Sequence, residues 1–183
     1  MVKGTGWITQ KKYGCLKQKW QRGYSDLKSL YSSLQPEILK YPVANFLRFD
    51  PVSKLAVISI ALALFDAKIA YAQGKKQEIS ILGANSSGAL EANLAYFNDY
   101  IANGRTLARG NLFIYTLPSS FLAEAAIHFG LTGKLLYLGF TNNAEEESLK
   151  YALNMLKDEP AKAIVLVNAD SKRATAQVLQ KKK

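Results

Sequence analysis

Two residue types that commonly carry nucleophilic or acid–base chemistry occur only once each in this sequence. Cys15 is the single cysteine and His128 the single histidine among 183 residues. One cysteine excludes an intramolecular disulfide and any site built from several thiolates, and one histidine excludes mechanisms that need a pair. Cys15 lies near a basic stretch, but nothing in the sequence pairs it with His128, so we interpret it as incidental. His128 ends an apolar helix, where a packing or capping role is favoured.

Three further motifs have the composition of functional sites but are incomplete. Residues 83–88, Gly-Ala-Asn-Ser-Ser-Gly, follow a strand and precede a helix as phosphate loops do, yet lack the Gly-Lys-Ser/Thr ending. Residues 4–6, Gly-Thr-Gly, are an equally incomplete dinucleotide fingerprint. Glutamates 145–147 open a helix, where they favour the helix dipole, but consecutive helical positions point in different directions. We therefore predict no metal site and no cofactor.

The charge of the chain is concentrated at its two ends. The net charge is +10, from 24 Lys+Arg against 14 Asp+Glu. Residues 1–48 hold nine Lys or Arg and two acids, and residues 171–183 hold five and none, whereas the middle is nearly neutral. Such ends attract nucleic acid, anionic membranes or acidic proteins. No nucleic-acid-binding signature accompanies the charge, so we do not expect a nucleic-acid partner.

Length and hydropathy predict one globular domain, residues 1–170, followed by a solvated basic tail, residues 171–183. No signal peptide opens the sequence, and Met1 is not followed by the glycine that myristoylation needs. The longest apolar stretch, residues 55–65, is too short to span a bilayer, which takes about 20 residues. We expect a cytoplasmic protein with no membrane partner.

Apolar runs and turn signals alternate along the chain. Strands are predicted over residues 2–9, 78–83, 134–140 and 163–167, the last two buried, with a short extended run over 113–117. Helices are predicted over residues 51–72, 89–102, 119–129 and 144–157, the first starting at Asp50-Pro51 and apolar almost all round. Residues 10–48 are predicted to be loops with one or two short helices. This alternation predicts an α/β fold with a mainly parallel sheet covered by helices on both faces.

The order of the landmarks is more specific than any single motif. The chain reads Gly-Thr-Gly-x-Ile-Thr at residues 4–9, Phe-Asp-x-x-Ser-Lys-Leu-Ala at 49–56, and Gly-x-Leu-Glu at 88–91. Tyr-Thr-Leu-Pro-Ser-Ser follows at 115–120, then Glu-x-Ala-Ile-His-Phe-Gly-Leu-Thr-Gly at 124–133. From residue 3 to about 170 the chain resembles the N-terminal half of a β-ketoacyl-ACP synthase, of the thiolase-like superfamily. That resemblance implies a thiolase-like fold.

Two departures from the family decide which chemistry the resemblance implies. The family's nucleophilic cysteine would fall in Thr141, Asn142 or Asn143, with Asn142 nearest, and an amide cannot form an acyl thioester. The family's two further catalytic residues lie in a C-terminal half for which this chain has no counterpart. The resemblance therefore implies a ketosynthase-like protein without self-sufficient condensation activity. The three residues are kept as candidates for orienting a thioester carbonyl.

The helix predicted over residues 144–157 supports a lone half of that fold. In the complete family fold this helix is sandwiched between two sheets and is apolar on all sides. Here the apolar residues form one stripe and charged or polar residues fill the remainder, and burying several unpaired charges would cost several kcal/mol each. The stripe consists of Leu149, Ala152, Leu153 and Leu156.

The leading hypothesis is a non-catalytic, ketosynthase-like accessory subunit of fatty-acid, polyketide or aryl-polyene pigment synthesis. The resemblance implies a homodimer or a heteromer with a full-length ketosynthase, and the basic ends suit an acidic acyl carrier protein. The candidate interface residues are Phe113, Tyr115, Leu117, Pro118, Ser119 and Phe121. Residual decarboxylation of a malonyl thioester, acyl binding, and nucleic-acid binding by the basic ends remain as alternatives.

Overall fold

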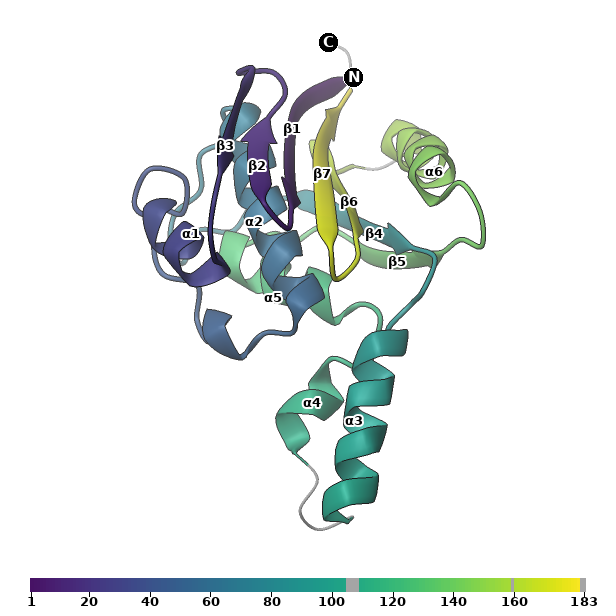
Figure 1. Ribbon diagram of the computed structural model, residues 1–183. Coiled ribbons are helices and arrows are strands. Elements are labelled where there is room, and N and C mark those ends of the chain that lie inside the picture. Colours follow the sequence, from purple (N-terminus) through teal and green to yellow (C-terminus); the bar gives the residue numbers. More distant parts are fainter. Residues whose placement is uncertain (105–108, 159, 182–183) are drawn as a thin grey trace.

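The computed structural model describes residues 1–104, 109–158 and 160–181. A single seven-stranded sheet forms the centre, with helices on both faces (Figure 1). The strand order is β3-β2-β1-β7-β6-β4-β5. The strands are β1 (Val2–Thr9), β2 (Lys12–Cys15), β3 (Trp20–Gly23), β4 (Ile79–Asn85), β5 (Leu135–Gly139), β6 (Ala163–Ala169) and β7 (Arg173–Gln180). The predicted α/β class is confirmed, but the expected mainly parallel sheet is wrong, because only β4–β5 and β4–β6 run parallel within the described residues.

Helix α2 (Pro51–Asp66) is the core of one face. Asp50 caps it by accepting from the Ser53 N–H, and Pro51 occupies the first turn, as predicted. The helix is buried nearly all round because glycines of β1 let it approach: a Cβ at Gly6 would lie 2.4 Å from the Ala63 nitrogen. It ends at Asp66, earlier than expected, where the carboxylate accepts three backbone N–H groups instead of facing solvent.

The residues predicted to form a basic tail are a central strand. Strand β7 lies between β1 and β6 and pairs antiparallel with both. Asp170 Oδ1 accepts from the Lys172 and Arg173 N–H groups, so a tight turn joins β6 to β7. Alternate residues of β7 then pack on α2; these are Ala174, Ala176 and Val178.

The N-terminal region is more regular than the predicted loops. Strands β2 and β3 extend the sheet beyond β1, and they are followed by α1 (Leu27–Ser33) and a short 3-10 helix (Phe46–Arg48). Asp26 begins α1 as an N-cap by accepting from the Ser29 N–H. Tyr31 and Phe46 stack with ring centroids 4.1 Å apart, which holds α1 against the 3-10 helix, and the Tyr71 hydroxyl donates to the Ile38 carbonyl at 2.7 Å, which joins the region to the body.

Two helices project away from the sheet (Figure 1). They are α3 (Leu90–Asn103) and α4 (Gly110–Ile114), which we call the arm. The extended run predicted at residues 113–117 is therefore wrong, since Phe113 and Ile114 belong to α4. Helices α5 (Ser120–Phe129) and α6 (Ala144–Asp158) return to opposite faces of the sheet, α5 beside α2 and α6 against β6.

Candidate partner interface

A buried carboxylate holds the arm together. Asp99 accepts from the backbone N–H and the Nε of Arg109, both at 2.8 Å, and from Asn103 Nδ2 at 3.0 Å. These donors lower the pKa of the Asp99 carboxyl, with the Arg109 backbone N–H as the main cause. Rings of Tyr96 and Phe113 meet edge to face at 5.4 Å. The hydrogen bonds of Asp99 and this aromatic contact thus hold α3 and α4 together.

Helix α3 places its apolar residues on the side that faces away from α4. Tyr96, Asp99 and Asn103 make the contacts just described, and they share one face of the helix. The opposite face carries an apolar stripe at spacings of four, three and four residues, and every member is exposed. We call it the α3 stripe; it consists of Leu90, Leu94, Phe97 and Ile101. An apolar stripe with this periodicity is the ordinary packing surface of a helix, so the fold leaves it without a partner in this chain's described residues.

The six interface residues predicted from sequence divide into two groups. Phe113 and Leu117 are exposed, the latter at 63%, which suits a contact surface. Tyr115 and Phe121 are buried at the root of the arm, and Pro118 and Ser119 are half-buried beside them. Tyr115 donates to Glu124 Oε1 at 3.2 Å, and burial together with that carboxylate raises the Tyr115 pKa.

A cavity of about 410 Å³ lies at the root of the arm. Its wall is mainly apolar and includes Leu112 and Tyr115 from the arm side, Phe121 from α5 and Pro51 from α2. The Asp50 carboxyl also lines it, and burial raises the pKa of that carboxyl. Neither Cys15 nor His128 lines the cavity, whereas Ser171 and Glu91 do, and the Ser171 hydroxyl donates to Glu91 Oε1 at 2.9 Å.

Strand β5 was predicted to be buried, and it is instead the open edge of the sheet. It pairs with β4 on one side and has no second strand beside it in the described residues. Its residues are half-buried or exposed. An unpaired strand edge presents free N–H and C=O groups to which another chain can add a strand.

The candidate positions Thr141, Asn142 and Asn143 lie together in the turn between β5 and α6. All three are exposed, and Asn143 adopts a left-handed backbone with φ of 50°. The structure thus brings them to the helix start as expected, but water has access to them. A thioester carbonyl held there would stay solvated, which removes most of the benefit of an oriented donor.

Asn85 is a buried polar residue that sequence reasoning treated only as part of a turn. Its Oδ1 accepts from Tyr137 Oη at 2.8 Å and from the Gly88 N–H at 2.7 Å, and its Nδ2 donates to the Ala169 carbonyl. One side chain therefore ties together the carboxyl ends of β4, β5 and β6 beside the root of the arm. The bonds are all internal, which assigns Asn85 a structural role.

Cys15 and His128 occupy separate buried positions. Cys15 lies under α2, donates to the Leu62 carbonyl, and burial raises its thiol pKa to about 12. His128 packs against Tyr41 and Phe129, and burial lowers its pKa to about 4, so it is neutral at pH 7. A thiol with that pKa is not a nucleophile near neutrality, which agrees with the interpretation of Cys15 as incidental.

Helix α6 has a solvated outer face. Glu146 and Glu147 both pair with Lys150 at 2.9 Å on that face. The inner side buries Ala152 and Leu156, whereas Leu153, expected in the apolar stripe, is exposed. Charged residues on one side of α6 are suited to water and not to a second sheet.

The described residues contain neither a cluster of metal-ligating side chains nor a helix suited to cross a membrane. No group of three or more His, Cys, Asp or Glu side chains is arranged to hold a metal ion there. None of the helices in that part of the chain is both long enough and apolar enough to cross a bilayer.

The fold is that of β-ketoacyl synthases and their chain length factors. Solved structures of that class superpose on almost the whole chain at 9–14% sequence identity, which establishes the thiolase-like fold expected from the sequence landmarks. No protein-family model and no curated protein matches the sequence.

Three of these structures illustrate the similarity. The ishigamide ketosynthase/chain length factor is 11% identical with a TM-score of 0.69, over 98% of this chain and 61% of that one. A ketosynthase in complex with its chain length factor from Xenorhabdus doucetiae is 13% identical with a TM-score of 0.64, over 100% of this chain and 79% of that one. The structure of a type II polyketide acyl carrier protein in complex with its ketosynthase matches with 9% sequence identity and a TM-score of 0.64. This match covers 98% of this chain and 57% of that one. The chain thus spans only part of the length of these proteins.

Proposed function

We propose that this chain is a non-catalytic, ketosynthase-like subunit that pairs with a second ketosynthase-fold chain. Its partner is either a full-length ketosynthase or a second copy of itself. The process it serves is the building of acyl chains, of fatty-acid, polyketide or aryl-polyene type. The observation that carries the proposal is the α3 stripe, an apolar helix face turned away from its own chain.

The stripe and the β5 edge support pairing in complementary ways. A helix face with this apolar spacing stabilises a protein only when it is covered, because exposed apolar area costs about 25 cal/mol per Å². The β5 edge adds main-chain groups that another strand can satisfy. Both features belong to a fold whose solved examples include a ketosynthase with its chain length factor.

The lack of a cysteine where the resemblance places the nucleophile supports a non-catalytic role. Thr141, Asn142 and Asn143 stand where the resemblance places the catalytic cysteine, and none of them forms a thioester. The single cysteine lies elsewhere, buried with a raised pKa. An accessory subunit needs the fold and the interface without this chemistry.

The test measures the mass of the purified chain, alone and mixed with a full-length ketosynthase from the same organism, by light scattering after size-exclusion chromatography. We expect a heteromer, and we expect Phe97→Glu to weaken it at least tenfold, because the charge would be buried at the interface. A matched control is Ile127→Glu, which changes an exposed apolar residue of α5 instead.

Two outcomes would contradict the proposal. One is a monomer that forms no complex with the ketosynthase or with itself. The other is a complex that Phe97→Glu and Ile127→Glu weaken equally, since the α3 stripe would then not be the contact.

Binding of an acidic acyl carrier protein is a further proposal that rests on the net charge of +10. We expect such binding to weaken as salt screens the charges, and binding that is unchanged by ionic strength would contradict it. Decarboxylation is tested by incubating the chain with a malonyl-loaded carrier protein and measuring loss of carboxylate, and we expect none.

A further inference from the structure

The start of β1, the loop between β2 and β3 and the end of β7 meet at one end of the molecule, whereas Arg173 lies at the other end of β7, opposite Thr9. Strands β1 and β7 pair along their lengths, so the Met1 nitrogen donates to the Gln180 carbonyl at 2.8 Å. The loop between β2 and β3 joins them, because the Leu16 N–H donates to Thr5 and Lys17 Nζ donates to the Lys3 carbonyl. The N-terminus and the end of β7 lie at this pole in Figure 1, with the arm at the opposite pole.

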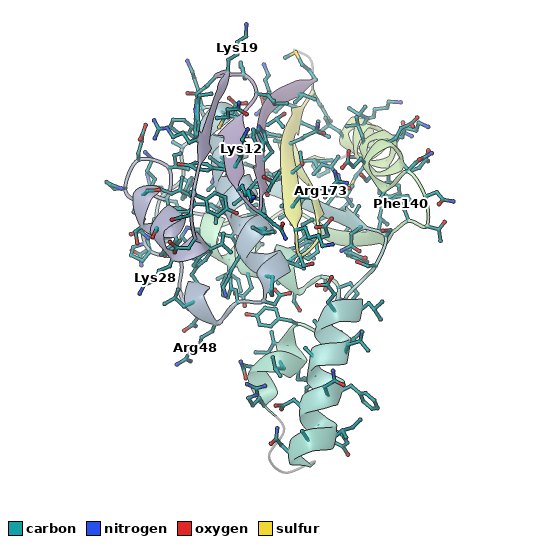
Figure 2. All side chains as sticks on the ribbon, in the orientation of Figure 1. Lys12, Lys19, Lys28, Arg48, Phe140 and Arg173 are labelled. Carbon is teal, nitrogen blue, oxygen red and sulfur yellow. The ribbon has the colours of Figure 1, made fainter. Side chains whose placement is uncertain are left out.

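The surface formed there combines lysines with exposed apolar side chains. We call it the basic rim; it comprises Met1, Val2, Lys3, Leu16, Lys17, Lys19, Lys68 and Lys181. Leu16 is 61% exposed at the tip of the β2–β3 loop, and Met1 and Val2 are also exposed. Lys19 points outward at this pole in Figure 2. The acid in the same segments, Asp66, is buried and accepts the Thr5, Lys17 and Gln18 N–H groups, so it does not offset the rim at the surface.

We propose that the basic rim binds an anionic phospholipid surface, with Leu16 entering the interfacial layer. Lysines near an anionic bilayer contribute about 1 kcal/mol each, and a stable contact needs a second, apolar signal. The rim supplies both signals. The expectation that no membrane takes part came from the lack of a spanning segment, and adsorption at a surface requires none.

The composition favours lipid over an acidic protein as the occupant. The basic side chains of the rim are all lysines, and the nearby Arg22 lies further along β3, opposite Tyr13. Protein interfaces, by contrast, are enriched in arginine and depleted in lysine. Arginine forms bidentate pairs with carboxylates, whereas lysine carries a compact point charge on a flexible stem, which suits a fluid layer of headgroups. The rim also lies at the opposite pole from the arm, so a partner on the arm leaves it accessible.

The experiment measures binding of the full chain to vesicles by flotation. The vesicles are neutral phosphatidylcholine, or the same lipid with roughly one third phosphatidylglycerol, which supplies the anionic surface. We expect binding to the anionic vesicles only, weakening as salt rises. Lys17→Glu combined with Lys19→Glu should weaken it by about tenfold or more, and Leu16→Ser by about threefold.

A charge-matched pair of substitutions is the control. Lys28→Glu combined with Arg48→Glu changes the net charge equally but lies away from the rim, as the labels of Figure 2 show. We expect this pair to keep binding within about twofold. The proposal would be overturned if the two pairs of substitutions weakened vesicle binding equally, or if the chain bound neutral vesicles. It would also be overturned if the chain bound a carrier protein in a salt-sensitive way and did not bind vesicles. None of these outcomes bears on the α3 stripe, so the proposed pairing is tested separately.

Discussion

The sheet body and the arm treat apolar side chains in opposite ways. In the body, α2 is apolar on every side and is enclosed by the sheet, α5 and the N-terminal region, with Leu62 and Leu64 fully buried. In the arm, a carboxylate is turned inward and the apolar residues are turned outward. The difference teaches that the body is stabilised by its own packing, whereas the arm displays a surface that is complete only when another chain covers it.

The largest difference in stability is expected when a leucine is replaced by alanine in each of the two regions. Leu62→Ala removes a fully buried side chain from α2 and should lower the free energy of unfolding by about 2–5 kcal/mol. Leu94→Ala removes a side chain of the α3 stripe that is 52% exposed, and should change the free energy of unfolding by less than about 0.5 kcal/mol. Urea unfolding followed by circular dichroism measures both. A large loss at Leu94 in the isolated chain would mean that the stripe is packed, which breaks the comparison.

Acidification from about pH 6.5 to pH 4 is expected to destabilise the body, whereas the lowered pKa of Asp99 keeps the carboxylate of the arm ionised over this range. Burial lowers the pKa of His128 from 6.5 to about 4, so on acidification the unfolded chain takes up the proton before the folded one. The contribution of neutral His128 is therefore complete above about pH 6.5 and falls progressively toward pH 4, by as much as about 3 kcal/mol. Unfolding measured across this range should lose most of that dependence in His128→Phe. A dependence of the same size in the variant would assign it to other groups.

The smallest global effect is expected from opening the arm. Asp99→Ala removes the acceptor of the Arg109 and Asn103 donors and should release α4 from α3. Hydrogen exchange should then speed up in residues 90–103 and 110–114. The free energy of unfolding of the body should fall by no more than about 1 kcal/mol. Asp158→Ala, an exposed acid at the end of α6, is the matched control. Cooperative loss of the whole sheet in Asp99→Ala would show that the arm and body form one unit.

Local signals in the sequence predicted much of the fold. Asp50-Pro51 marked the start of α2, and apolar runs bounded by turn signals identified β1, β4 and β6. Strand β7 was missed because lysines flank it, so its alternation of small apolar residues was read as a solvated tail. The exposure of β5 was missed because a leucine-rich run has the same composition at a sheet edge as in its centre. Strand order depends on long-range pairing, which local periodicity does not contain.

The candidate interface stays a prediction. Of the residues chosen from the segment 113–121, Phe113 and Leu117 are exposed, whereas Tyr115 and Phe121 pack inward. The α3 stripe was visible in the sequence as Leu90, Leu94, Phe97 and Ile101, yet spacing alone cannot tell whether such a face meets its own chain. That distinction required the position of α4 on the other side of the helix.

The place of β7 also governs the order in which the molecule is assembled. Strand β1 pairs with β2 and β7 in the described sheet, so no sheet hydrogen bond links β1 to the β4–β5–β6 part until β7 is in place. Until then the two parts of the sheet share only their packing on α2, which contacts both β1 and β6. Joining them is a single late event in which one eight-residue strand closes the sheet from both sides.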